Sequence, residues 1–318
     1  MSVPRFRVLP TPYEQARREN TRRQLNKWAV IVLFTVPSMI IFTLFLLMPI
    51  AQSAYFSLFD WDGFGPLSDF IGLGNYERLL NHSVFQGAVL HSLLIMLLSL
   101  VIQLPLALGL ALLVGRGKLR GKKAFRMFLF VPYVFSEVMT AIIWRYVLNP
   151  GDGLANVVLH FFIPGAENIA WLADRNIALL CVFAVLTWKY FGFYMILYMA
   201  GLQSIPVDLE EAARVDGATE PQVLRSITLP MLGSTIRLTV FMSVVGSFQQ
   251  FVLVWVLTEG GPVNASELIA TYLYKFGIQR FWLGYGSAVA IVLFLITLVF
   301  SLGYQRIVLR QDYAVENL

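Results

Sequence analysis

The stretch LQSIPVDLEEAARVDGATEPQVLRSITLPMLGSTIR, residues 202–237, is a polar interval between two long apolar runs. Pro206 suits the first turn of a helix, and the acidic residues Asp208, Glu210 and Glu211 that follow it favour the N-terminal end of that helix. Gly217 can adopt the left-handed backbone conformation that commonly ends a helix. The first half of the stretch therefore predicts a short helix that ends at this glycine.

The second half of the stretch predicts another short helix. Thr219 and Gln222 have the spacing of a capping box, with Pro221 in the first turn. Pro230 is expected to end or redirect this helix. One face of it is apolar and consists of Val223, Leu224 and Ile227. Two short helices around a glycine elbow either pack against the ends of neighbouring helices or form a docking surface for a partner protein, and both interpretations stay open.

Six apolar runs surround this stretch, and a membrane-spanning helix needs about 20 mostly apolar residues. Of the 318 residues, 58% are hydrophobic and only 14% are charged, against about 25% charged residues in an ordinary soluble domain. This composition excludes a typical soluble enzyme and predicts an all-α membrane protein with six transmembrane helices. The predicted spans are residues 28–50, 88–114, 128–148, 177–200, 238–257 and 286–305.

The distribution of Lys and Arg predicts the orientation of these spans. Eighteen of the 24 Lys and Arg residues lie in the N-terminal segment, the loops after the second and fourth spans, and the C-terminal tail. Because basic residues concentrate on the cytoplasmic side, both termini and the 202–237 loop are expected in the cytoplasm. The spread over four segments favours a topology signal over a nucleic-acid surface.

The expected organisation is a basic cytoplasmic segment 1–27, a six-helix domain 28–308 that includes the 202–237 loop, and a cytoplasmic tail 309–318. The first apolar run is long and follows a polar stretch, which indicates an uncleaved span rather than a signal peptide.

The sequence shows no catalytic arrangement. Residues 115–123, GRGKLRGKK, resemble a phosphate-binding loop but lack the G-x-x-x-x-G-K-[ST] spacing. With one cysteine and three histidines, neither an internal disulfide nor a His/Cys metal site is expected. No Ser/His/Asp or paired-carboxylate arrangement stands out. We therefore expect no catalytic residue, no metal and no ATPase site of its own in this chain.

Polar residues lie near the middle of several predicted spans, where ionisable groups are costly and often functional. Glu137 lies at the centre of the third span and Lys189 at the centre of the fourth. Aromatic faces beside amide and charged groups suit the C–H faces and hydroxyl edges of a sugar. A purely structural ion pair between Glu137 and Lys189 is the alternative. The residues predicted to line a transport path are Gln103, Tyr133, Glu137, Trp188, Lys189, Tyr190, Tyr194, Phe248, Gln249 and Gln250.

The 202–237 stretch also resembles a known family. The residues EAA at 211–213, a glycine at 217 and I-x-L-P at 227–230 match the EAA loop of binding-protein-dependent ABC importer permeases. The form EEAARVDGA is similar to that of the carbohydrate-type permeases, such as the maltose transporter membrane subunits. Three other stretches resemble the same family: GLGNY at 72–76, LTEGGP at 257–262 and GYGSA at 284–288. The resemblance covers nearly the whole chain.

This resemblance implies the type I ABC importer permease fold and the import of a sugar, either an oligosaccharide or a related polyol, across a bacterial plasma (inner) membrane. The implied partners are a second homologous permease, two ATPase subunits that bind ATP and magnesium, and an extracytoplasmic solute-binding protein. The residues implied in coupling to the ATPase are Glu211, Ala212, Ala213, Asp216, Gly217, Ile227, Leu229 and Pro230. Those implied in docking of the binding protein are Asn75, Gly260, Gly261 and Pro262.

Other functions remain open on the sequence alone. A secondary transporter would need inverted repeats, and no clear internal repeat is visible. A membrane enzyme would need a catalytic constellation. A permease for a non-sugar solute, such as a glycerol phosphate ester, is compatible with the same motifs. In the maltose-type pair only one of the two membrane subunits holds the sugar, so the partner permease is the other candidate for the substrate site.

Overall fold

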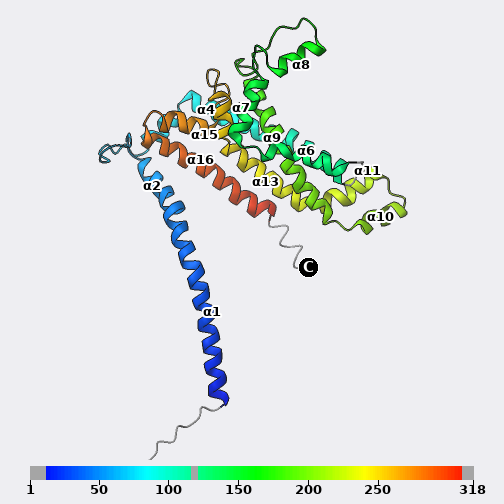
Figure 1. Cartoon of the computed structure of the whole chain (residues 1–318). Coiled ribbons are helices and arrows are strands. Elements are labelled where there is room, and N and C mark those ends of the chain that lie inside the picture. The colour runs from blue at the N-terminus through cyan, green and yellow to red at the C-terminus, as the bar shows by residue number, and fades with distance from the viewer. Residues whose placement is uncertain (1–11, 116–120, 310–318) are drawn as a thin grey trace, which may run out of the picture. The chain divides into compact units, whose positions relative to one another are not determined.

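The computed structural model describes residues 12–115 and 121–309 (Figure 1). The predicted basic segment 1–27 and the tail 309–318 lie largely outside the residues whose side chains are described, as do residues 116–120 of the basic loop. The described residues are helical apart from turns, loops and one isolated bridge between Phe59 and Phe70. The chain divides into two units, Met1–Tyr55 and Phe56–Leu318, and each is described by itself.

The first unit is a long helix. It consists of α1 (Pro12–Phe42), a π-helical turn η1 (Thr43–Leu47) and α2 (Met48–Phe56), the last residue of which begins the second unit. The segment Lys27–Phe56 is 30 residues long, and its most apolar 18-residue window has a mean hydropathy of 2.7. At about 1.5 Å per residue it is long enough to cross a bilayer, and it contains the predicted first span.

The second unit contains three more helices that are long and apolar enough to span a membrane. The first is α4 (Ser83–Leu98) with η2 (Ser99–Gln103) and α5 (Leu104–Gly115). The others are α9 (Ala178–Gln203) and α16 (Leu283–Tyr304), which η5 (Gln305–Leu309) extends. Two bent helix pairs raise the number of spans in the described residues from 4 to as many as 6. The prediction of an all-α membrane protein is therefore confirmed.

The predicted third span is not one straight helix. It consists of α6 (Lys122–Val134) and α7 (Glu137–Val147), which meet at an angle of 100°. The Ser136 hydroxyl caps α7 by accepting a hydrogen bond from the Met139 backbone N–H at 3.2 Å. Glu137 therefore lies at the start of a helix, not at the centre of a span as the sequence suggested.

The predicted fifth span is also interrupted. Its helix begins earlier than expected, as α13 (Gly233–Gln249), and a second helix, α14 (Val252–Thr258), follows a break at residues 250–251. Gln249 and Gln250 thus lie at a break between helices. Backbone groups freed at such a break are tolerated in membrane proteins only where protein or a cavity surrounds them.

The remaining elements of the second unit are short. Four of them lie at one end of the spans: α3 (Gly74–Leu80), α8 (Leu154–Phe162), α15 (Ile269–Tyr272) and the π-helical η4 (Leu273–Ile278). At the other end lie α10 (Val207–Val215), α11 (Glu220–Val223), the π-helical η3 (Leu224–Thr228) and α12 (Leu229–Met231).

Helix α9 is the central helix of the second unit. It packs against α5, α6, α7 and α13, and 56% of its most apolar window is buried, against 17% for α16. At Gly192 a Cβ atom would lie 2.0 Å from the Leu129 carbonyl oxygen, so only glycine allows α6 to approach this closely. This contact brings the end of α6 and the polar residues of α9 together.

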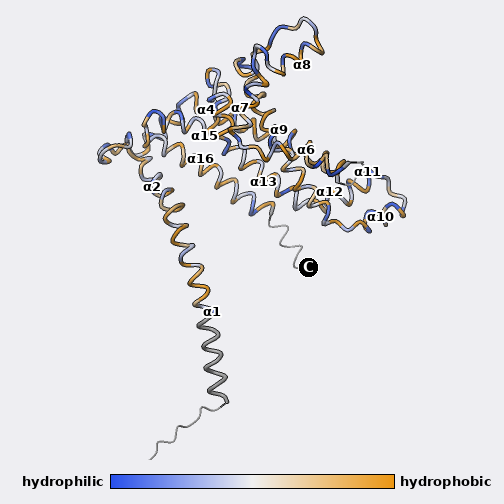
Figure 2. The backbone as a smooth tube through the Cα atoms, in the orientation of Figure 1, coloured by the Kyte–Doolittle hydropathy of each residue, from blue (hydrophilic) through white to orange (hydrophobic). Residues whose placement is uncertain are grey.

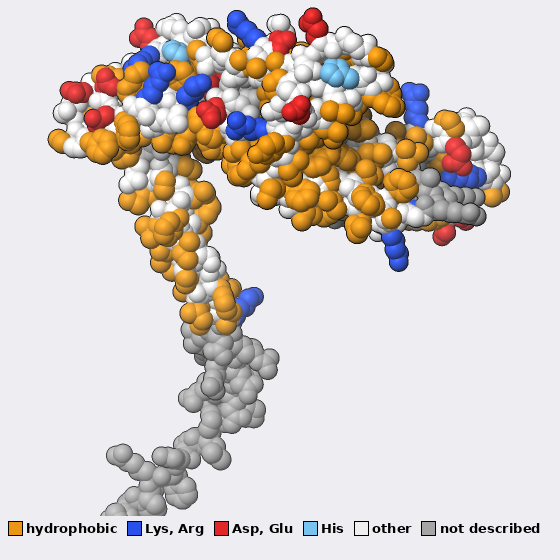
Figure 3. All heavy atoms as spheres, turned by 45° about the horizontal axis from the view of Figure 1, so that its top comes forward, with side chains coloured by type: hydrophobic (Ala, Val, Ile, Leu, Met, Phe, Trp, Pro, Cys, Tyr) orange, Lys and Arg blue, Asp and Glu red, His pale blue; other side chains and the backbone are white. Residues whose placement is uncertain are grey.

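The outer surfaces of the other spans are apolar. Figure 2 shows hydrophobic residues along α13 and α16 and a more hydrophilic segment around α10. Figure 3 shows apolar side chains over much of one face of the second unit, with charged side chains gathered towards its edges. Large apolar residues of the spans such as Leu90, Val101 and Val299 are exposed. An apolar surface of this extent is typical of a protein whose solvent is lipid.

Candidate functional site

The predicted glycine elbow is present in the polar loop. Helix α10 ends at Val215, and Gly217 has a φ of +88°. The Ala218 N–H donates to the Ala213 carbonyl at 2.9 Å, and the Gly217 N–H donates to the Arg214 carbonyl at 3.1 Å. These two bonds form a Schellman motif, which satisfies the last carbonyls of the helix and requires a left-handed residue. The prediction for Gly217 is confirmed.

The second helix begins as predicted but does not end as predicted. The Thr219 N–H donates to the Gln222 side-chain oxygen at 2.7 Å, which is the expected capping interaction. The helix then continues through η3 and past Pro230 to Met231. A 65° bend separates it from α13, two residues after the proline.

Two side-chain contacts fasten the helices of the loop to each other. The Thr228 hydroxyl donates to Glu210 at 3.0 Å, and Arg214 pairs with Glu220 at 2.7 Å. Hydrogen bonding to Arg214 holds the pKa of the Glu220 carboxyl below its usual range. Glu210 is 4% exposed, so it holds the loop together, whereas the neighbouring Glu211 is exposed. Sequence reasoning gave no role to Glu210 in this contact.

The residues predicted to couple to an ATPase form a partly open surface. Ala213, Ile227 and Leu229 are half-buried, whereas Glu211, Ala212, Asp216, Gly217 and Pro230 are exposed. Val223 is buried, and together with Leu112 and Leu224 it lines a hollow of about 330 Å³ between the loop and α5. The apolar face of the second helix therefore packs partly on the protein itself, and the EAA face remains open for contact.

A cavity of about 310 Å³ lies among α4–α5, α6–α7, α9 and α13. Its lining includes the hydroxyl groups of Ser99, Ser243 and Ser247. They were not identified from the sequence, because serine is common in membrane helices and gives no signal by itself. Gly246 leaves room beside them. Seven of the predicted path residues line this cavity: Gln103, Tyr133, Glu137, Tyr190, Tyr194, Gln249 and Gln250.

Glu137 reaches the cavity because the break between α6 and α7 turns the chain there. The Tyr190 hydroxyl donates to Glu137 Oε1 at 2.5 Å. Tyr133 stacks on Phe193 with ring centroids 4.7 Å apart. Among the residues that line the cavity, Glu137 is the one carboxylate, and none is Lys, Arg or His.

Three predicted path residues do not line the cavity. Trp188 packs edge-on against Trp144, and Phe248 is buried in the apolar core that also contains Phe85 and Tyr272. Lys189 is 3% exposed, and its ammonium group donates to the backbone carbonyls of Phe135 at 2.6 Å and Tyr133 at 3.5 Å. The side chains of Glu137 and Lys189 are therefore near each other but form no direct ion pair.

The GGP turn is built around a buried carboxylate. Gly260 has a φ of +77°, and a Cβ atom there would lie 2.4 Å from Glu267 Oε2. Glu267 is fully buried and pairs with Lys275 at 3.0 Å. Asn75 is also buried, because its amide donates to the carbonyls of Ser57 and Phe59. Its side chain holds the loop that contains Ser57 and Phe59, and it is not exposed at the surface.

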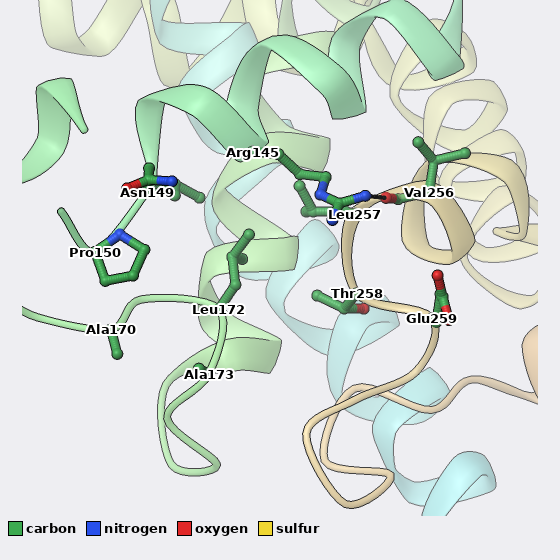
Figure 4. Close-up of a pocket in the computed structure, with 11 residues that line it drawn as sticks. Arg145, Asn149, Pro150, Ala170, Leu172, Ala173, Val256, Leu257, Thr258 and Glu259 are labelled. Carbon is green, nitrogen blue, oxygen red and sulfur yellow. Dashed lines mark hydrogen bonds between the residues drawn. The ribbon is translucent and has the colours of Figure 1, made fainter. Parts of the chain in front are cut away.

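A second cavity, of about 300 Å³, lies beside the GGP turn (Figure 4). Arg145 from α7 donates from Nη1 to the Val256 carbonyl at 3.4 Å across its edge. Thr258 and Glu259 come from the LTEGGP stretch, and Asn149 follows α7. The cavity lies between the C-terminal end of α7 and the loop predicted to dock the binding protein.

These features define an all-helical, multi-pass membrane transport subunit with an exposed loop of the EAA type. Residues 103–313 match the family described as "Binding-protein-dependent transport system inner membrane component". The chain belongs to this family, and it is therefore a membrane permease component of an ABC transporter. The type I importer permease fold predicted from the sequence is confirmed.

Several curated relatives are similar over most of their length. The chain is 38% identical to "Probable ABC transporter permease protein YurN" of Bacillus subtilis, over 85% of this chain and 92% of the relative. It is 33% identical to "Lactose transport system permease protein LacF" of Rhizobium radiobacter, over 87% and 92%. It is 29% identical to "Diacetylchitobiose uptake system permease protein NgcF" of Streptomyces coelicolor, over 92% and 86%.

A solved structure has the same fold. The chain is similar to a chain of a bacterial alginate ABC transporter, determined in complex with an alginate pentasaccharide-bound periplasmic protein. The TM-score is 0.77 at 25% sequence identity, over 89% of this chain and 95% of the other.

Proposed function

We propose that this chain is a membrane subunit of an ATP-driven importer for a neutral sugar, an oligosaccharide or a related polyol. It forms half of the translocation path, together with a second homologous permease. Relatives named for lactose and diacetylchitobiose uptake support a sugar as the solute.

The composition of the central cavity supports a neutral solute over an anionic one. Tyrosine rings and the amide groups of Gln103, Gln249 and Gln250 suit the faces and hydroxyl groups of a sugar. Glu137 is the one carboxylate of the lining, and the ammonium group of Lys189 is engaged by backbone carbonyls behind it. An anionic solute such as a glycerol phosphate would meet like charge in a low-dielectric site. The alternative of a glycerol phosphate ester is therefore the less favoured one.

The polar loop is the site where the chain receives the energy of ATP hydrolysis. Glu211 and Ala212 are exposed on a helix whose end is fixed by the Gly217 elbow, and this observation carries the proposal of ATP coupling. A carboxylate flanked by a small residue suits a basic residue in a groove of a partner. The partners are two ATPase subunits, which bind ATP and magnesium.

The orientation follows from the basic residues. Arg214, Arg225 and Arg237 accompany the coupling loop, which is placed in the cytoplasm with both termini. The GGP turn and the Arg145 cavity are then on the outer face, where an extracytoplasmic binding protein delivers the solute. The membrane is a bacterial plasma (inner) membrane.

The test is energised uptake in cells that carry the tagged chain with its own partners. We expect uptake of radiolabelled lactose or diacetylchitobiose that persists with a protonophore, and magnesium-dependent ATP hydrolysis in the purified complex. Labelled sn-glycerol 3-phosphate should not be taken up by this route. Glu211→Lys should abolish uptake, while the exposed-site control Glu77→Lys should retain it. Uptake that collapses with the protonophore, with no ATPase in the complex, would indicate a secondary transporter instead.

A further inference from the structure

An arginine–tryptophan–arginine cluster lies at one end of the second unit, away from the cavity and the coupling loop. The Arg78 guanidinium carbon lies 4.3 Å from the Trp282 ring centroid, and that of Arg280 lies 5.3 Å from the same centroid. Arg280 also lies 4.2 Å from the Phe276 ring. Both arginine side chains are exposed, so the aromatic contacts hold the guanidinium planes while their N–H edges stay open.

The two positive charges are not neutralised by the protein. In the described part of the chain, no ion pair within 4.0 Å includes Arg78 or Arg280. His82 between them does not add a counter-charge. Burial first, then the charges of Arg78 and Arg280, lower the pKa of its imidazole, and its Nδ1 lies 2.9 Å from the Tyr272 hydroxyl. The cluster therefore presents two free guanidinium groups on fixed aromatic supports.

The position of the cluster relates it to the membrane surface. Arg78 lies five residues before the span that begins at Ser83, and Arg280 lies three residues before the span that begins at Leu283. Trp282 and Tyr285 are aromatic residues of the kind that concentrate at membrane–water interfaces. Helix α3, which carries Arg78, packs against α16. Both arginines thus lie just outside the ends of two apolar spans, where lipid headgroups are expected.

Exposed apolar side chains adjoin the two arginines in the sequence. Leu80 is 62% exposed, Ile278 is 47% exposed and Phe281 is 55% exposed. A cationic pair with an adjoining apolar surface matches the two ends of a phospholipid, because the phosphate meets the guanidinium edges and the acyl chain meets the apolar side chains. A carboxylate of a soluble partner would leave these apolar side chains uncovered.

We propose that Arg78 and Arg280, held by Trp282, bind the phosphate of an anionic phospholipid at the outer surface of the membrane. The ligand chemistry is a phosphate diester attached to acyl chains, and phosphatidylglycerol is a suitable probe. Each arginine near a lipid surface contributes a factor of about 5 in affinity, so the pair contributes a factor of about 30.

The experiment uses the purified transport complex in detergent, stripped of lipid and titrated with phosphatidylglycerol under native mass spectrometry. The double variant Arg78→Gln/Arg280→Gln should bind one lipid about 30-fold more weakly, and each single variant about 5-fold more weakly. Arg175→Gln, which removes another exposed outer arginine, is the matched control and should bind as the wild type does. Without lipid, all variants should still unfold cooperatively with little loss of stability, because the changes remove only exposed cation–π contacts.

Two results would overturn the proposal. Equal phosphatidylglycerol binding by the wild type and the double variant would mean that the cluster faces something else, such as a carboxylate of a protein partner. Competition by equimolar inorganic phosphate would mean that the site takes free phosphate and not a lipid. The proposal is supported if the double variant loses phosphatidylglycerol binding and if equimolar inorganic phosphate does not displace the lipid from the wild type.

Discussion

The ammonium group of Lys189 lies 2.6 Å from the carbonyl oxygen of Phe135, at the 100° break between α6 and α7. The next residue of α9, Tyr190, donates to Glu137 on the other side of the same break. Two consecutive residues of the central helix therefore hold both halves of a broken span. Lys189 fixes the carbonyl end of α6, where a positive charge is favoured, and Tyr190 fixes the first residue of α7.

Lys189→Met should destabilise the protein by about 2 kcal/mol, because the carbonyls of Tyr133 and Phe135 lose a charged donor inside the membrane. Thermal unfolding of the purified complex measures this loss. If the main role of the lysine were to neutralise the charge of Glu137, the additional substitution Glu137→Gln would restore stability. We expect no such recovery, since the two side chains form no direct ion pair. A double variant as stable as the wild type would contradict this account.

Glu210 and Glu211 are adjacent in the sequence but should behave differently. Glu210→Ala removes the buried partner of Thr228 and of Arg214, so it should loosen the loop and cost about 1–3 kcal/mol. Glu211→Ala removes an exposed carboxylate, so it should leave unfolding unchanged and weaken association with the ATPase. Thermal unfolding and pull-down of the ATPase separate the two effects. Equal loss of stability in both variants would argue against the division of roles.

Gly217→Val should strain the elbow by about 1–2 kcal/mol, because the position has a φ of +88°. No side chain lies within 4 Å of a Cβ atom there, so the cost is one of backbone conformation and not of space. Gly109→Ala is the matched control, since this glycine is helical and equally open. Limited proteolysis of the loop should be faster in the first variant alone. Unchanged cleavage in Gly217→Val would show that the elbow tolerates a side chain.

The sequence predicted the helical class, the approximate spans and the elbow, because these depend on local composition. Apolar length defines a span, and glycine alone reaches the conformation at position 217 at little cost. The breaks at residues 135–136 and 250–251 were not predicted, because the polar residues beside them, Glu137, Gln249 and Gln250, were interpreted as path residues within continuous spans. Ser136 is the one local signal for the first break, as a helix cap.

The candidate site was predicted in part for the same reason. Residue type identified seven members of the cavity, but depth along a straight helix misplaced Lys189, Trp188 and Phe248. Whether a side chain faces the cavity depends on the rotation of a helix and on the angle at the α6–α7 break. Neither quantity is determined by the local sequence.

The proposed topology can be tested with two exposed valines. Val263 follows the GGP turn and is 78% exposed, and Val215 ends α10 and is 86% exposed. In a Cys181→Ser background, a membrane-impermeant maleimide added to intact spheroplasts should label Val263→Cys and not Val215→Cys. Permeabilised cells should show labelling of both positions, which controls for reactivity. Labelling of Val215→Cys from outside would reverse the orientation and remove the coupling loop from the cytoplasm.

The free energy of unfolding of the protein should depend on pH through His82. Burial and the neighbouring Arg78 and Arg280 lower the pKa of its imidazole below the value of about 6.5 that it has in an unfolded chain. Between these two pKa values the unfolded chain binds more protons, so stability rises with pH in that window. The stability that comes from keeping His82 neutral is fully present above a pH of about 6.5. It decreases as the pH falls through the window and stays constant below the pKa of the folded state. His82→Gln should flatten the pH dependence of the melting temperature between about pH 7 and 5. An identical slope in His82→Gln and the wild type would show that His82 titrates alike in both states.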